Sequence, residues 1–183
     1  MKIEKNFKEI IVELDNNRKV ISNEVIENTP KRISEFYGEI FSGLGKNPNE
    51  HLKRKFSVDN NSMIVEKNII FYSMCEHHFL PFFGKIDIGY IPNGKIVGFG
   101  DLVKVIETYS KRPQLQERLG EEIAETIYKE LACQGVYIRI EAEHLCMTMR
   151  GVKAAGSKMI TTVGKGCFEN NSNLRLELLA LLK

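Results

Sequence analysis

No stretch of the 183-residue sequence approaches the roughly 20 consecutive apolar residues that a membrane-spanning helix needs, so we expect no membrane role. The N-terminal run MKIEKNFKEIIVELDNNRK has neither the apolar core nor the small-residue cleavage site of a signal peptide, which predicts a cytoplasmic protein. The sequence also lacks an excess of either charge, because its net charge is only +2 and basic residues are interspersed with acidic ones. This pattern does not predict a nucleic-acid-binding surface and favours a small-molecule substrate.

Cysteine and histidine are both scarce, with four of each in the chain. Three of them nevertheless lie within the four-residue run CEHH, which spans residues 75–78, and another pair, His144 and Cys146, lies in the run HLC. In a reducing compartment such thiols are expected to be free or bound to a metal, because disulfides do not persist there. Metal binding and burial in the core are therefore the two interpretations of these residues.

The hydrophobic pattern predicts two N-terminal helices followed by an antiparallel sheet with helices against it. Residues 3–22 carry apolar positions at helical spacing, and a second helix is expected to begin with Thr29 as N-cap and Pro30 at its first position. Two strands, at about 62–74 and from residue 84 to the Pro-Asn-Gly turn at 92–94, are expected to form a hairpin with CEHH at its connection. The chain length suits one domain of ordinary size with a helical extension.

The second half of the chain is predicted to contain a long helix and two further strands. From Pro113 an apolar stripe recurs at every fourth residue, so this helix should pack on the sheet; the stripe consists of Leu115, Leu119, Ile123, Ile127 and Leu131. Residues 135–151 are expected to be a strand whose single face leads from core residues to His144, Cys146 and Arg150. A strand at about 157–168 and a short closing helix, capped by Ser172 and ending at Leu182, complete the expectation.

The spacing of the thiols and imidazoles suits one metal ion. Zinc accepts mixed sulfur and nitrogen ligands, and a catalytic zinc usually keeps three protein ligands and one open position. Cys75, His78 and Cys146 provide such a set. His77 and His144 would then remain beside the metal, where imidazoles can transfer protons at neutral pH.

The alternative is a closed structural site made of two cysteines and two histidines. For an arbitrary pair of Cys-x-x-His and His-x-Cys motifs, a structural and a catalytic site are about equally expected. Three features argue against it: there is one histidine too many, the ligands come from distant segments, and Arg150 extends the same strand face as an anion-binding group. Cys133 and Cys167 are interpreted as structural residues.

Five motifs, in this order and at compatible spacing, resemble GTP cyclohydrolase I: FYSMCEHHFLPFFGK, GYIPNGKIVGFG, RPQLQERL, HLCMTMRGV and GSKMITT. The resemblance covers roughly residues 26–183. It implies an α+β tunnelling fold, in which an antiparallel sheet is backed by two long helices and preceded by an N-terminal helical extension. On this basis we expect a helical region at 1–45 and a catalytic domain at 46–183. It also implies a homodecamer, built as a double ring, with active sites between subunits.

The resemblance assigns roles residue by residue. The zinc ligands fall on the same three residues chosen above from ligand chemistry, the proton-transfer histidine on His144, and the histidine near the ribose on His77. Gln116 and Glu117 match the pair that holds the guanine edge, although a glutamate in a first helical turn is also favoured by the helix dipole alone. Arg150 and Arg32 match phosphate-binding arginines, the latter from a neighbouring subunit. The implied reaction is hydrolytic opening of the guanine imidazole ring of GTP, with release of formate and formation of 7,8-dihydroneopterin triphosphate.

The run VGFGDLVK departs from the family pattern. Gly100 replaces a serine, Asp101 replaces a lysine, and Lys104 occupies the position of an arginine, so the triphosphate pocket loses one cation and gains an anion. Each charge at ~4 Å from a phosphate interacts with it by roughly 4 kcal/mol gross, so the exchange requires compensation. Lys158 is expected to rebuild part of the anion site, and Asp101 can also serve as the N-cap of the following helix.

Two enzymatic hypotheses remain open. The protein is either a GTP cyclohydrolase I with a rearranged triphosphate site, or a related hydrolase that opens or deformylates a guanine nucleotide, prefers another phosphorylation state and lacks the full rearrangement. A zinc-stabilised ring protein that only binds a purine or pterin is disfavoured by the two free histidines. A nitrile-reducing member of the tunnelling fold is disfavoured by the intact ligand set.

Overall fold

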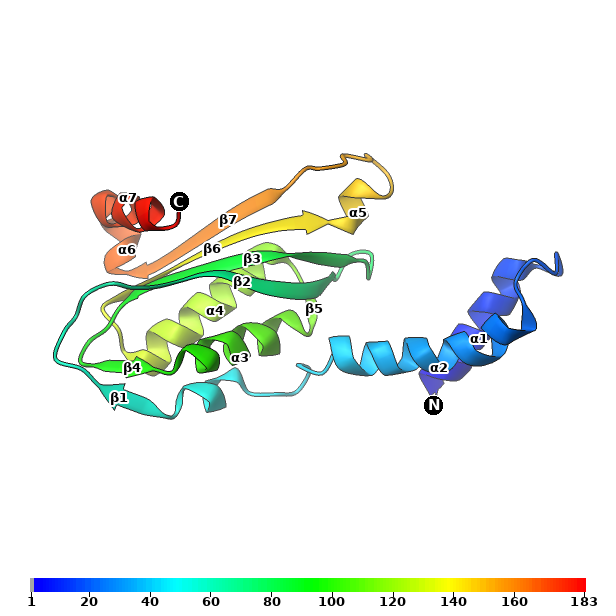
Figure 1. Cartoon of the computed structure of the whole chain (residues 1–183), viewed down its shortest axis with the longest axis horizontal. Helices are drawn as coiled ribbons and strands as arrows, with labels where there is room; N and C mark the ends of the chain where they lie inside the picture. The colour runs from blue at the N-terminus through cyan, green and yellow to red at the C-terminus, as the bar shows by residue number, and fades with distance from the viewer. Residues whose placement is uncertain (1) are drawn as a thin grey trace. The chain divides into compact units, whose positions relative to one another are not determined.

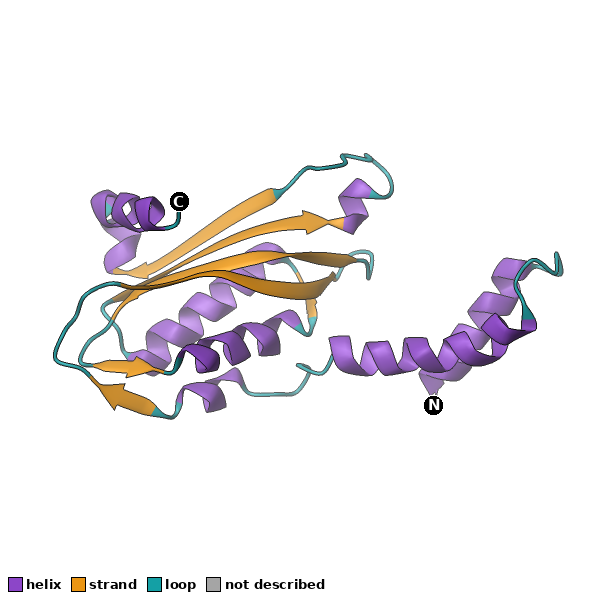
Figure 2. Cartoon of the chain, in the orientation of Figure 1, coloured by secondary structure: helices purple, strands orange, loops and turns teal. Residues whose placement is uncertain are grey.

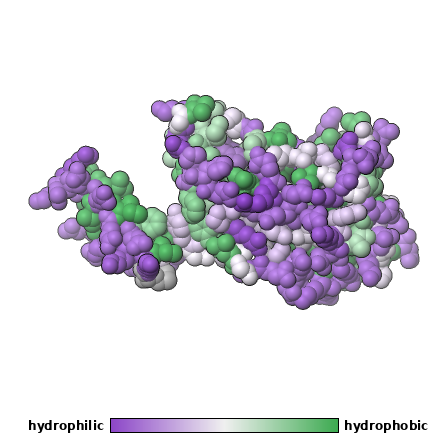
Figure 3. Space-filling model, turned by 180° about the vertical axis from the view of Figure 1, so that it is seen from behind, coloured by the Kyte–Doolittle hydropathy of each residue, from purple (hydrophilic) through white to green (hydrophobic). Residues whose placement is uncertain are grey.

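The computed structural model describes residues 2–183, which divide into two units, residues 2–42 and Gly43–Lys183 (Figure 1). The N-terminal unit consists of α1 (Lys2–Asp15) and α2 (Asn23–Ile40). Aromatic side chains join the two helices, since the rings of Phe7 and Tyr37 lie 5.3 Å apart between centroids. Several apolar side chains of this unit remain exposed, and Figure 3 shows apolar atoms among the hydrophilic ones on its surface.

Helix α2 begins seven residues earlier than the sequence predicted, at Asn23 instead of Pro30. The Asp15 carboxylate accepts hydrogen bonds from the backbone N–H groups of residues 19–21, which ends α1 and forms a turn. Ser22 then caps α2, because its Oγ accepts a hydrogen bond from the Val25 N–H. The prediction of Thr29 as N-cap was therefore wrong. Pro30 lies inside α2, which continues with one backbone donor missing.

The larger unit is built on a five-stranded sheet with the strand order β5-β2-β3-β6-β7 (Figure 2). Strands β2 (Ile64–Cys75), β3 (Pro81–Ile91), β6 (Gly135–His144) and β7 (Met159–Gly166) are antiparallel to their neighbours, and β5 (Pro113–Gln114) runs parallel to the end of β2. The short strands β1 (Lys55–Ser57) and β4 (Lys95–Val97) form a separate antiparallel pair. The predicted hairpin is confirmed, with CEHH between β2 and β3.

Two long helices, α3 (Phe99–Ser110) and α4 (Gln116–Leu131), pack against one face of the sheet (Figure 1). The predicted apolar stripe is buried from Leu119 to Leu131, and it meets the inward-facing isoleucines of β3 and β6 in one core together with Leu52 of η1 (Pro48–Leu52). The α+β prediction of an antiparallel sheet backed by two long helices is confirmed. No helix among the described residues is long and apolar enough to cross a membrane.

The C-terminal helices lie against the other face of the sheet. Helix α6 (Cys167–Asn170) follows β7 directly, and α7 (Ser172–Leu181) places Leu178 in a small core with Tyr137 and Phe168. Leu178 occupies the space above Gly89 of β3, where any added Cβ would lie 2.6 Å from its methyl carbons. The N-cap of α7 is Asn171, whose Oδ1 accepts from the Leu174 N–H, so the prediction of Ser172 was wrong by one position.

Candidate functional site

The CEHH segment is a tight connection at one end of the sheet. The Cys75 N–H donates to the Leu80 carbonyl and the Phe79 N–H donates to the Cys75 carbonyl, each over 2.9 Å. Phe79 adopts a left-handed conformation with φ of 51°. The Glu76 N–H also donates to the Gln114 carbonyl of β5, over 3.1 Å. These bonds place Cys75, buried at the end of β2, two residues before the exposed His77 and three before the exposed His78.

The second part of the site is not the continuous strand that the sequence predicted. Strand β6 ends at His144, and Leu145–Thr148 form the short helix α5. The prediction that His144, Cys146 and Arg150 share one strand face was therefore wrong. A two-residue step along a strand would carry Cys146 well beyond His144, whereas the helical turn keeps it at the end of the sheet near Cys75.

Cys75, His78 and Cys146 come together in the folded chain. One ligand atom from each of these residues lies within 4.8 Å of the other two, and together they form a group that could hold a metal ion. Burial is the main cause, and the neighbouring Cys75 a smaller one, of a raised pKa for the Cys146 thiol, so a nearby cation would be needed to hold this sulfur as a thiolate. Two sulfurs and one imidazole nitrogen are a donor set that fits zinc and leaves a fourth position free.

A pocket of about 400 Å³ opens beside this group. Its lining includes most of the site residues predicted from the sequence. It also includes residues for which no site role was predicted: Gln114, Leu115, Ala142, Met147, Ser157 and Met159. The predicted residues in the lining are Cys75, His77, Gln116, Glu117, His144, Cys146 and Lys158.

His144 lies half-buried at the end of β6. Its ring stacks on Phe82 with a centroid distance of 4.7 Å and an interplanar angle of 5°, and its Nε2 lies 2.9 Å from Gln116 Oε1. Burial lowers the pKa of His144, and the charge of Glu117 opposes this effect. Glu117 itself is exposed in the first turn of α4, so its carboxylate is accessible from the pocket.

The predicted phosphate-binding cations are less closely grouped. Lys158 lines the pocket, but its Nζ forms a 2.8 Å ion pair with Glu141. The hydrogen bond from Lys158 is the main cause, and that from Arg139 the second, of a lowered pKa for the Glu141 carboxyl. Arg150 follows α5 and is exposed. Its positive charge acts to lower the pKa of the Cys146 thiol, against the larger effect of burial. Arg32 is exposed on α2 of the N-terminal unit.

Lys104 lies on α3 and is not part of the pocket lining. Its Nζ forms a 2.9 Å ion pair with Asp101 Oδ1. The suggestion that Asp101 caps this helix was wrong, since Gly98 is the N-cap and Asp101 is the third residue of the helix, within its first turn. The negative charge of Asp101 is therefore neutralised by the positive charge of Lys104, three residues along the same helix.

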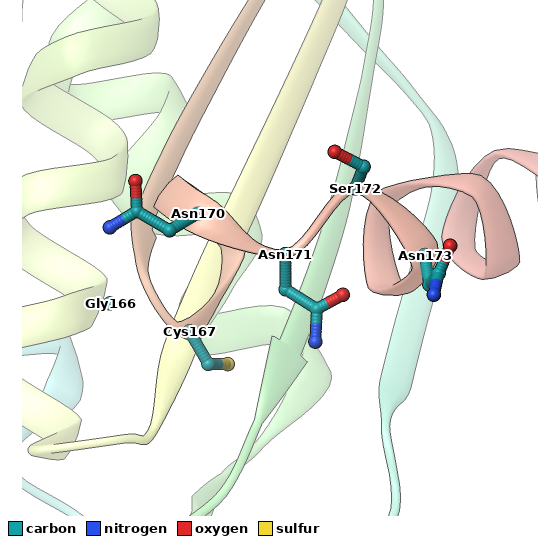
Figure 4. A pocket seen from close by; sticks show the side chains of 6 residues that line it. All are labelled: Gly166, Cys167, Asn170, Asn171, Ser172 and Asn173. Carbon is teal, nitrogen blue, oxygen red and sulfur yellow. The ribbon is translucent and has the colours of Figure 1, made fainter.

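A second pocket, of about 530 Å³, lies at the opposite end of β7. It is lined by Gly166, Cys167 and residues 170–173. Figure 4 shows the amides of Asn170, Asn171 and Asn173 pointing in different directions instead of toward one point. Burial raises the pKa of the Cys167 thiol, which makes it a poor nucleophile. The chemistry is therefore concentrated in the first pocket.

The chain is closely similar to curated proteins over its full length. A family model for GTP cyclohydrolase I matches residues 3–183, a longer range than the 26–183 expected from the motifs. A GTP cyclohydrolase 1 from Fusobacterium nucleatum is 56% identical over 182 residues, covering 100% of this chain and 96% of that protein. Those from Clostridium perfringens and Streptococcus sanguinis are 49% and 47% identical, each covering 88% of both chains. A crystal structure of the archaeosine synthase QueF-Like in the apo form covers 59% of this chain and 97% of its own, with 17% identity and a TM-score of 0.48, which is too distant to bear on function.

An antiparallel sheet backed by two long helices, with a cysteine–histidine–cysteine group beside a pocket, is the arrangement expected for the tunnelling fold and provides a candidate metal centre. The chain belongs to the GTP cyclohydrolase I family, as the family model and the three relatives show.

Proposed function

We propose that the protein is a zinc-dependent GTP cyclohydrolase I, which hydrolyses the guanine imidazole ring of GTP, releases formate and forms 7,8-dihydroneopterin triphosphate. The observation that carries this proposal is the approach of Cys75, His78 and Cys146 to within 4.8 Å beside a pocket large enough for a nucleobase. Family membership supports the same reaction class.

Zinc would be held by the three ligands. It would supply a Lewis acid that lowers the pKa of a bound water toward neutrality. His144 is the group that delivers a proton to the guanine imidazole ring, since it is the half-buried imidazole in the pocket. His77 lines the same pocket and is exposed, which suits a role near the ribose.

Glu117 is the residue that selects guanine. Its exposed carboxylate can accept hydrogen bonds from both the ring N–H and the exocyclic amine of guanine, an arrangement that adenine does not offer. A site built to hydrogen-bond a substrate group rejects the analogue that lacks it by several kcal/mol. Gln116, the other residue matched to guanine binding, is only 1% exposed.

The triphosphate would be bound by Lys158 and Arg150, together with Lys104 and with Arg32 from a neighbouring subunit. This assignment goes with the proposal of a homodecamer whose sites lie between subunits, with residues 1–45 as a helical extension of the catalytic domain at 46–183. Replacing Lys158 with methionine should weaken the binding of a phosphorylated substrate far more than the binding of the bare nucleoside. Equal weakening of both would remove Lys158 from the anion site.

A second candidate, a guanine-nucleotide hydrolase with altered phosphate preference and no rearrangement, is favoured by one observation. The ion pair between Lys104 and Asp101 leaves that run without net positive charge.

One experiment separates the candidates: GTP, GDP, GMP and guanosine are offered to zinc-replete protein, and formate release and pterin fluorescence are followed separately. Formate and pterin from GTP together support the first proposal. Formate without pterin, or a preference for a less phosphorylated substrate, supports the second, and no turnover of any guanine compound contradicts both.

A further inference from the structure

Gln116 makes contacts that determine the orientation of its side-chain amide. It is the first residue of α4 and is 1% exposed. Its Nε2 lies 3.3 Å from the Ile140 carbonyl oxygen, 3.2 Å from the Met159 carbonyl oxygen and 3.0 Å from Thr161 Oγ1. The two carbonyl oxygens can only accept hydrogen bonds, so the amide nitrogen, not the amide oxygen, must face them.

The amide oxygen consequently faces His144. Gln116 Oε1 lies 2.9 Å from His144 Nε2, and an amide oxygen can only accept, so the hydrogen atom of this bond belongs to Nε2. In the neutral imidazole the other nitrogen, Nδ1, then carries the lone pair. Stacking on Phe82 holds the plane of the ring, so the hydrogen bond and the stack together fix the orientation of His144.

We propose that Gln116 is a positioning residue that fixes the Nε2–H tautomer of His144, so that Nδ1 is the atom that exchanges protons with the substrate. This inference rests on the proposed function of His144, and it replaces the guanine-binding role that the family resemblance suggests for Gln116. The proton balance is simple. Nδ1 takes a proton from solvent, its N–H bond breaks as a new N–H bond forms on the guanine imidazole ring, and the Nε2–H bond to Gln116 is kept throughout.

The tautomer can be measured without turnover. The chain has only four histidines, so ¹⁵N-histidine-labelled protein gives a spectrum in which the signals of His144 can be assigned by their loss in His144→Gln. The wild-type protein should show Nε2 protonated and Nδ1 unprotonated in neutral His144. A protonated Nδ1 in neutral His144 of the wild type overturns the proposal by itself, even if a Gln116 variant fails to fold.

Gln116→Met removes the acceptor for His144, and Thr161→Val is the matched control. Thr161→Val removes one partner of the Gln116 amide but leaves the two carbonyl oxygens that set its orientation. We expect Gln116→Met to give a mixture of the two His144 tautomers and Thr161→Val to keep the wild-type form. An unchanged tautomer in Gln116→Met contradicts the proposal.

Steady-state kinetics separate positioning from substrate binding. A positioning role predicts that kcat for Gln116→Met falls by about 100-fold, in the range of acid–base contributions, with little change in KM. A guanine-binding role predicts instead that KM rises, and that result would return Gln116 to substrate recognition. If the wild-type protein turns over no guanine compound, the proposed function fails, whereas the tautomer measurement still decides on Gln116.

Discussion

Replacing Glu66 with glutamine should stabilise the protein at neutral and alkaline pH. Glu66 lies in β2 opposite Ile88 and is 3% exposed, and neither of its carboxylate oxygens has a hydrogen-bond partner among the described residues. Burial raises the pKa of this carboxyl from its ordinary value of 4.5 to about 7. The free-energy cost of holding Glu66 ionised in the folded protein follows from this difference in pKa, because a tenfold change in an acid dissociation constant corresponds to about 1.4 kcal/mol. The ionised carboxylate therefore costs about 3 kcal/mol of folding free energy.

The sign and the pH range follow from the two pKa values. Below pH 4.5 the carboxyl is protonated in both the folded and the unfolded chain, so Glu66 then makes no pH-dependent contribution. Between pH 4.5 and about 7 the unfolded chain loses its proton first, so stability falls as pH rises. Above about pH 7 both states are ionised and the loss is complete.

Urea denaturation of Glu66→Gln and wild type, at equal protein concentration, measures this difference. We expect the variant to be more stable by about 1 kcal/mol at pH 5 and by about 3 kcal/mol at pH 8. Glu177→Gln, at an exposed position of α7, serves as the control and should show little difference at either pH. A Glu66→Gln difference that is the same at both pH values, or a destabilised variant at pH 8, would refute the reasoning.

Two further predictions concern packing and capping. Gly89→Val should lower the free energy of unfolding by about 1–3 kcal/mol, because the added Cβ would clash with Leu178. Gly100→Ala is the control and should cost much less, because a Cβ at position 100 has open space around it. Equal denaturation midpoints for the two variants would contradict this packing. Asn171→Ala should cost about 1 kcal/mol through loss of the α7 cap, and Ser172→Ala should cost less in the same assay; the reverse order would restore Ser172 as the cap.

Local patterns in the sequence were sufficient to predict the main elements of the larger unit. The repeat of Leu119, Ile123 and Ile127 predicts a buried helical face whatever the rest of the chain does, and the alternation in β3 predicts a strand. The approach of Cys75, His78 and Cys146 was expected from ligand chemistry, since few arrangements bring these scarce residues to one ion.

Element ends and side-chain partners could not be predicted in the same way. Residues 145–148 contain no glycine or proline to mark the end of β6, and the short helix α5 that they form contacts β3 and β6, which no local pattern reveals. The start of α2 depends on which of several capping residues is used. The amide of Gln116 is oriented by residues 24 to 45 positions away, a relation that no local pattern contains.

X-ray absorption at the zinc edge of the zinc-replete protein tests the central claim most directly. We predict two sulfur neighbours at about 2.3 Å in the wild type, one in Cys146→Ser, and still two in Cys167→Ser, since Cys167 lies in α6 and lines the other pocket. A zinc ion that keeps both sulfurs in Cys146→Ser, or that binds no sulfur in the wild type, would contradict it.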